Sequence, residues 1–244
     1  MDKFAAWMVH VFTASGIIPG FFAIVAISND RIALAFLMLL IAQVIDGIDG
    51  TLARVFRVHE VLPTTSGKMM DSVIDFATYA IIPAYLIYMS PAILPDGPWI
   101  REFTVSVILV VSALYYGKAG MISDDLYFVG FPALWNWVAF YLYYIIGGSP
   151  WVNFGLILLF AFLHFVPIKY VYPSRSERLW WLNVAVTIVL LLSILMVLLL
   201  QEALIVIEGA IQPLRVVAVG AMFYFFGVGV YQSWLDLRAA SADK

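Results

Sequence analysis

The sequence of 244 residues contains no cysteine, and only 12% of its residues are charged. Without cysteine there are no disulfides, thiolate metal ligands, iron–sulfur clusters or cysteine nucleophiles. With so little charge the chain cannot cover a water-facing exterior, because soluble domains are about one quarter charged. The formal charge of −3 provides no basic surface for a nucleic acid, so we expect no nucleic-acid partner.

Apolar residues are what the sequence has in excess, at 64% of the chain. They form continuous runs, such as residues 185–200, where only Thr187 and Ser193 are polar. Transmembrane strands would alternate polar and apolar residues. A helix of about 20 apolar residues instead spans the hydrocarbon core and satisfies its own backbone hydrogen bonds. The sequence therefore predicts an all-α, multi-pass integral membrane protein, folded as a single domain over residues 1–244.

About eight transmembrane helices are predicted, of which the fourth and the sixth are short. Their expected ranges are 7–27, 32–48, 72–94, 103–117, 127–147, 151–167, 180–200 and 214–234. With this topology, ten of the 13 lysines and arginines fall on one side of the membrane. Because cytoplasmic loops carry the basic excess, we expect both termini and the loop between the second and third helices to be cytoplasmic.

Four aspartates stand where the second and third predicted helices meet this loop. Asp46 and Asp49 are three residues apart and Asp71 and Asp75 are four apart, so each pair shares one helix face. We expect the two helices to be antiparallel neighbours that bring the four carboxylates together. Single acids at helix ends are usually only solvated, but Asp46 and Asp75 fall inside apolar segments, where acids usually mark a functional site.

Carboxylates brought together repel one another, and hard divalent cations relieve that repulsion. Two ions shared by such acids would stabilise an in-line displacement at phosphorus. The sequence therefore predicts a site for Mn²⁺ or Mg²⁺, with two ions, at the cytoplasmic ends of the second and third helices. The expected metal ligands are Asp46, Asp49, Asp71 and Asp75.

The same residues carry a family resemblance. The pattern Asp46-x2-Asp49-Gly50-x2-Ala53-Arg54, followed by Gly67-x3-Asp71-x3-Asp75, resembles the signature of the CDP-alcohol phosphotransferases. The twelve residues between Arg54 and Gly67 make a longer gap than most members have, and this gap is similar to that of the bacterial phosphatidylcholine synthases. The resemblance implies transfer of the phosphatidyl group from CDP-diacylglycerol to the choline hydroxyl, with release of CMP, in a bacterial inner membrane.

The resemblance also implies a role for each motif residue. Asp71 and Asp75 are the expected catalytic residues, and Asp75 is either a metal ligand or the general base for the choline hydroxyl. The residues expected to contact the CDP group are Asp49, Gly50, Ala53, Arg54 and Gly67. Small residues at these positions would serve close helix packing equally well. Choline is a cation suited to aromatic faces, and the aromatic candidates are Tyr79, Tyr116 and Trp135.

The expected partners are CDP-diacylglycerol, choline, membrane lipids and, from the family resemblance, a second copy of the chain. Serine, glycerol phosphate or an inositol compound is an alternative acceptor, although only Arg57 and Lys68 add positive charge near the motif, which favours an uncharged or cationic acceptor. A divalent-cation transporter would also place acids in the membrane. Transporters often contain internal repeats, whereas the four acids here have no counterpart in the later spans. Arg175 and Arg178 are expected to contact anionic head groups.

Overall fold

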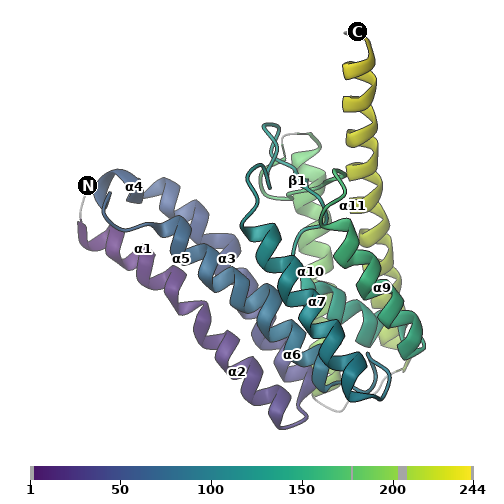
Figure 1. The fold of residues 1–244 in the computed structure, drawn as a ribbon. Helices are drawn as coiled ribbons and strands as arrows, with labels where there is room; N and C mark the ends of the chain where they lie inside the picture. Colours follow the sequence, from purple (N-terminus) through teal and green to yellow (C-terminus); the bar gives the residue numbers. More distant parts are fainter. Residues whose placement is uncertain (1–2, 177, 203–207, 243–244) are drawn as a thin grey trace.

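The computed structural model describes residues 3–176, 178–202 and 208–242, and most of them are helical (Figure 1). The predicted all-α class is confirmed. The helices are α1 (Lys3–Ser15), α2 (Ile17–Ser28), α3 (Ile32–Val55), α4 (Val58–Val61), α5 (Gly67–Asp75), α6 (Ile82–Met89), α7 (Pro98–Tyr116), α8 (Trp135–Phe140), α9 (Pro150–Leu163), α10 (Trp180–Glu202) and α11 (Glu208–Ala242), with π-helical turns η1 (Phe76–Ile81) and η2 (Tyr141–Ile146). Two short strands, β1 (Phe128–Val129) and β2 (Lys169–Tyr170), pair antiparallel.

Six helical segments of the described chain are long and apolar enough to cross a membrane, fewer than the eight expected. They are Lys3–Ser28, Ile32–Val55, Gly67–Met89, Pro98–Tyr116, Trp180–Glu202 and Ile211–Arg238. The expected helix 127–147 becomes helical only at Trp135, because the residues before it form β1 and irregular backbone. The expected helix 151–167 ends at Leu163 and is a short apolar helix. A buried irregular segment has side chains as apolar as those of a membrane helix, so composition alone does not distinguish the two.

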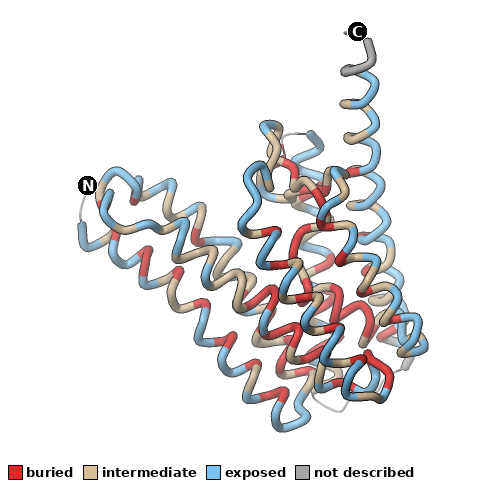
Figure 2. Tube along the Cα trace, in the orientation of Figure 1, coloured by how far each residue is buried: buried red, intermediate tan, exposed pale blue. Residues whose placement is uncertain are grey.

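Buried residues concentrate where α6 to α10 pack together and along the inner face of α3 (Figure 2). The outer faces of α1, α2, α10 and α11 instead expose large apolar side chains, among them Phe21, Leu192 and Phe223. In a membrane protein such residues face lipid, since lipid tails are as apolar as leucine. The bundle is therefore apolar both inside and outside.

The beginning of α1 and the end of α11 lie at the same end of the bundle, uppermost in Figure 1. That end also carries α4 and the small sheet. The expectation that both termini lie on one side of the membrane stays a prediction, and the terminal residues Met1 and Lys244 lie outside the described residues. Because α11 has 35 residues, or about 52 Å at 1.5 Å per residue, its last turns project beyond the bundle (Figure 1).

Candidate metal centre

The acidic motif lies on two antiparallel helices, as the sequence predicts. α3 continues beyond the expected end at residue 48 to Val55, so the whole first half of the motif is helical. α5 begins after Ser66, whose side-chain oxygen accepts a hydrogen bond from the backbone N–H of Met69 at 3.2 Å, a regular N-cap. α1 contacts both helices and closes one side of the site.

Three of the four aspartates converge closely. One carboxylate oxygen from each of Asp46, Asp49 and Asp71 lies within 4.8 Å of the others. Asp49 is buried, and Asp46 and Asp71 are partly buried. Three acid oxygens at this spacing, in a partly buried position, form a donor set that suits a hard divalent cation.

Asp75 completes the group from the last residue of α5. Its side chain neighbours those of Asp46 and Asp71. One of its oxygens, Oδ1, is buried and has no hydrogen-bond partner among the described residues. A buried oxygen left without a donor is unfavourable, and a bound cation or a substrate proton at this position would satisfy it.

Two side chains orient the acids. The hydroxyl of Tyr79 donates a hydrogen bond to Oδ2 of Asp46 at 2.7 Å, and Tyr79 is itself buried. The side chain of Thr13, on α1, lies beside the carboxylate of Asp49. The sequence predicts a choline contact for Tyr79, whereas its hydroxyl holds a candidate metal ligand. Nothing in the sequence around Thr13 marks it as part of the site.

The small residues of the motif are divided between the site and helix packing. A Cβ atom on Gly50 would lie 3.5 Å from Nη1 of Arg54 and 3.8 Å from Nη2 of Arg175, so Gly50 borders two guanidinium groups. A Cβ on Gly67 would lie 3.1 Å from Cε1 of His10. Ala53 packs against the apolar cluster that joins α1 to α4. Gly67 and Ala53 thus permit α1 to approach closely, which is the alternative role that the sequence left open.

Arg175 reaches the acids from more than 100 positions further along the chain. It interacts electrostatically with Asp46 and Asp71. Its guanidinium lies over the ring of Tyr172, 5.1 Å from the centroid, and Tyr172 stacks on Phe128 at 4.6 Å. The sequence predicts a head-group contact for Arg175; its position beside the acids depends on the fold of the loop after α9, which no local spacing reveals.

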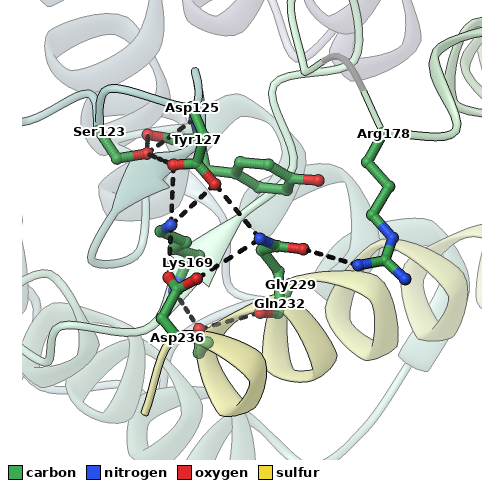
Figure 3. A network of polar contacts seen from close by, with 9 residues as sticks. Ser123, Asp125, Tyr127, Lys169, Arg178, Gly229, Gln232 and Asp236 are labelled. Atoms are coloured by element: carbon green, nitrogen blue, oxygen red, sulfur yellow. Dashed lines mark hydrogen bonds and ion pairs between the residues drawn. The ribbon is translucent and has the colours of Figure 1, made fainter. Parts of the chain in front are cut away.

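β2, which precedes Arg175 in the chain, packs against α11, and Figure 3 shows the polar contacts of Lys169 there. Nζ of Lys169 lies 2.7 Å from Oδ1 of Asp125 and 2.5 Å from Oδ2 of Asp236. The backbone N–H of Lys169 donates to Ser233 Oγ at 2.8 Å. We call Lys169, Asp125, Asp236 and Ser233 together the Lys169 clasp. A Cβ on Gly229 would lie 2.2 Å from the Lys169 carbonyl oxygen, so only glycine permits this approach of β2 to α11.

The charges in the clasp stabilise one another. Burial alone would lower the pKa of Lys169, but hydrogen bonds and attraction from Asp125 and Asp236 outweigh it and raise that pKa. Burial alone would raise the pKa of Asp125, but its hydrogen bonds from Lys169 and Ser123 lower it. Both groups therefore remain charged at neutral pH.

The two remaining choline candidates are placed differently. Tyr116 interacts electrostatically with Asp75 and Asp46, and its ring meets that of Phe76 edge-on at 5.8 Å, so it lies beside the acids. Trp135 is fully buried. Its indole N–H donates to Ser112 Oγ at 2.8 Å and its ring stacks on His164 at 5.4 Å. The structure gives Trp135 a packing role in the core and does not bring it to the acids.

Comparison with known proteins finds similarity over about two thirds or more of this chain. The family model described as CDP-alcohol phosphatidyltransferase matches residues 5–166. A phosphatidylcholine synthase of Pseudomonas aeruginosa is 38% identical over 234 residues, which cover 96% of this chain and 94% of that protein. Phosphatidylcholine synthases of Mesorhizobium japonicum and Borreliella burgdorferi are 39% and 35% identical, over 75% of this chain in each case and over 67% and 77% of their own lengths.

Proposed function

The chain belongs to the CDP-alcohol phosphatidyltransferase family, and we propose that it is a phosphatidylcholine synthase. The reaction transfers the phosphatidyl group of CDP-diacylglycerol to choline and releases CMP. The single observation that carries the proposal is the convergence of the motif acids, with oxygens of Asp46, Asp49 and Asp71 within 4.8 Å of one another. The printed names of the relatives support choline as the acceptor.

Asp46, Asp49 and Asp71 hold the divalent cations in this proposal, and Asp75 completes the set. Mn²⁺ or Mg²⁺, as two ions, would neutralise the diphosphate and the leaving CMP. The hydroxyl oxygen of choline attacks the β-phosphorus, and the bond from that phosphorus to the bridging oxygen of CMP breaks. Asp75 accepts the hydroxyl proton, a role that its unpartnered buried oxygen supports.

In this proposal the CDP group lies along the motif helices, near Asp49, Gly50, Ala53, Arg54 and Gly67. Ala53 and Gly67 at the same time allow α1 to pack closely. Gly50 and Arg54 are best placed for phosphate, because Gly50 borders the Arg54 guanidinium and arginine binds phosphate in a bidentate manner. Tyr116 is our candidate for the choline cation, since it lies beside Asp75 and an aromatic face attracts quaternary ammonium. The hydroxyl of Tyr79 is engaged with Asp46, which leaves Tyr79 a positioning role.

We further propose that the protein is a homodimer in a bacterial inner membrane, with the acid cluster and both termini on the cytoplasmic side. The bias of basic residues and the shared end of α1 and α11 (Figure 1) support the orientation. The family resemblance supports the dimer. The acids cluster on two helices, and the described residues contain no second group of three or more potential metal ligands, which favours an enzyme over a cation transporter.

A panel of acceptors tests this function. Purified protein with Mn²⁺ and CDP-diacylglycerol would be given labelled choline, serine, inositol or glycerol 3-phosphate. We expect lipid product and stoichiometric CMP with choline alone. Product with serine instead would overturn the acceptor and leave the family assignment standing, whereas Mn²⁺ flux through vesicles without CMP release would favour the transporter.

A further inference from the structure

A shallow, open groove lies at the beginning of α10. Its volume is about 660 Å³, and it is lined by Arg175, Leu179, Trp180, Trp181 and Leu182. One cation and four apolar side chains thus surround it. This composition suits a ligand that carries both a phosphate and a hydrocarbon chain.

Arg175 belongs to both the groove and the acid site. Its Nη2 lies 3.8 Å from the position that a Cβ on Gly50 would occupy, and it interacts electrostatically with Asp46. Among the described residues no carboxylate lies within ion-pair distance of Arg175. Its guanidinium donors are therefore available to a phosphate bound at the acids.

The apolar wall of the groove is tied to the turn that carries Arg175. The indole N–H of Trp180 donates to the carbonyl oxygen of Ser174 at 3.2 Å. Trp181 is 79% exposed, and tryptophan is enriched at membrane interfaces. From this point α10 continues as an apolar span of the membrane. A hydrocarbon chain in the groove would thus run from a polar site directly toward lipid.

We propose that this groove binds the diacylglycerol half of the liponucleotide. Arg175 holds a phosphate of the diphosphate, and the wall formed by Leu179, Trp180 and Leu182 receives an acyl chain. The inference rests on the proposed function and deepens it, because it assigns the lipid part of the substrate to a second arginine and to α10. Arg175 is thereby a substrate-binding residue contributed from outside the sequence motif.

Chain-length dependence of the Michaelis constant separates this groove from general lipid contact. Leu182→Trp fills the groove, and Leu192→Trp is the matched control on the exposed, lipid-facing side of the same helix. Since each buried methylene changes affinity about fourfold, Leu182→Trp should raise KM at least tenfold for dioleoyl CDP-diacylglycerol and less than twofold for the dihexanoyl substrate. Leu192→Trp should change neither. An equal change in KM for the two substrates, or no change for either, would overturn the assignment of the groove as the acyl-chain site.

The variant Arg175→Gln tests the proposed phosphate contact. Loss of a bidentate phosphate contact should raise KM for both chain lengths by about tenfold or more, with kcat at saturating substrate changed far less. Arg178→Gln is the control, since Arg178 lies over the ring of Tyr231 at 5.1 Å, on α11. An unchanged KM in Arg175→Gln would overturn the phosphate assignment.

Photolabelling tests directly where the acyl chain of the substrate binds. CDP-diacylglycerol with a diazirine at the end of one acyl chain should label residues 179–182, and unlabelled CDP-diacylglycerol should suppress the labelling while phosphatidylglycerol vesicles do not. Labelling elsewhere, or equal suppression by the two lipids, would overturn the assignment of the groove as the acyl-chain site. The proposed function would still stand if the wild-type protein turned over its substrates. A wild-type protein that releases no CMP from CDP-diacylglycerol would overturn the proposed function and the groove together.

Discussion

The hydroxyl of Tyr79 donates a 2.7 Å hydrogen bond to Oδ2 of Asp46, which joins the π-helical turn η1 to the acid face of α3. The bond fixes the orientation of a carboxylate that belongs to the candidate metal set. Partners of this kind typically contribute 10- to 100-fold to metal affinity. The short turn after Asp75 is thus part of the site, although it contributes no metal ligand.

Tyr79→Phe should therefore raise the Mn²⁺ concentration needed for half-maximal CMP release by roughly 10- to 100-fold. The maximal rate at saturating Mn²⁺ should change little, because the reacting groups remain. Tyr85→Phe is the control, since the Tyr85 hydroxyl hydrogen-bonds with Ser28 away from the acids. An altered KM for choline with an unchanged Mn²⁺ requirement would instead support the direct choline contact predicted from the sequence.

The Lys169 clasp should stabilise the protein over a broad pH range. Asp125 has a pKa lowered from its ordinary value of 3.8, so its contribution is present above that pH and is lost as the pH falls through the lowered pKa. Lys169 has a pKa raised from 10.5, so its contribution is present below that pH and is lost as the pH rises through the raised pKa.

Lys169→Met should accordingly lower the free energy of unfolding by about 1–3 kcal/mol near neutral pH, measured by thermal unfolding in detergent. The difference from wild type should shrink below pH 3.8 and above pH 10.5. Lys118→Met, on an exposed lysine, is the control. A difference that stayed constant across the whole range would show that lost packing, rather than the ion pairs, accounts for the effect.

The close approach of β2 to α11 should make two neighbouring glycines respond in opposite ways. Gly229→Ala places a Cβ 2.2 Å from the Lys169 carbonyl oxygen, whereas a Cβ on Gly227 meets no atom within 4 Å. The first substitution should destabilise by about 1–3 kcal/mol, and the second should stabilise by up to about 1 kcal/mol, as alanine does in a helix.

Activity distinguishes the same pair of variants. Because β2 leads into Tyr172 and Arg175, Gly229→Ala should also raise KM for CDP-diacylglycerol, and Gly227→Ala should leave it unchanged. Equal stability of the two variants would contradict the observed packing. A destabilised Gly229→Ala protein with a normal KM would show that the clasp does not position Arg175.

The sequence predicts the helical membrane class and the meeting of the acids because both depend on local pattern. Apolar runs reveal helices, and the i,i+3 and i,i+4 spacing of Asp46, Asp49, Asp71 and Asp75 reveals one face on each of two joined helices. The same local patterns do not predict the backbone of residues 127–134, because their apolar side chains belong to a largely buried loop rather than to a helix. Arg175 and Lys169 meet partners that are far away in the sequence, and no local spacing in a single sequence reveals such contacts.

The central claim is that the clustered motif acids bind the divalent cation on which phosphatidyl transfer depends. Electron paramagnetic resonance titration of Mn²⁺, with CMP release followed in the same preparations, tests it most directly on wild type, Asp71→Asn and the exposed control Asp124→Asn. We predict at least tenfold weaker Mn²⁺ binding and loss of CMP release in Asp71→Asn, with Asp124→Asn like wild type. Wild-type Mn²⁺ affinity and turnover in Asp71→Asn would contradict the account.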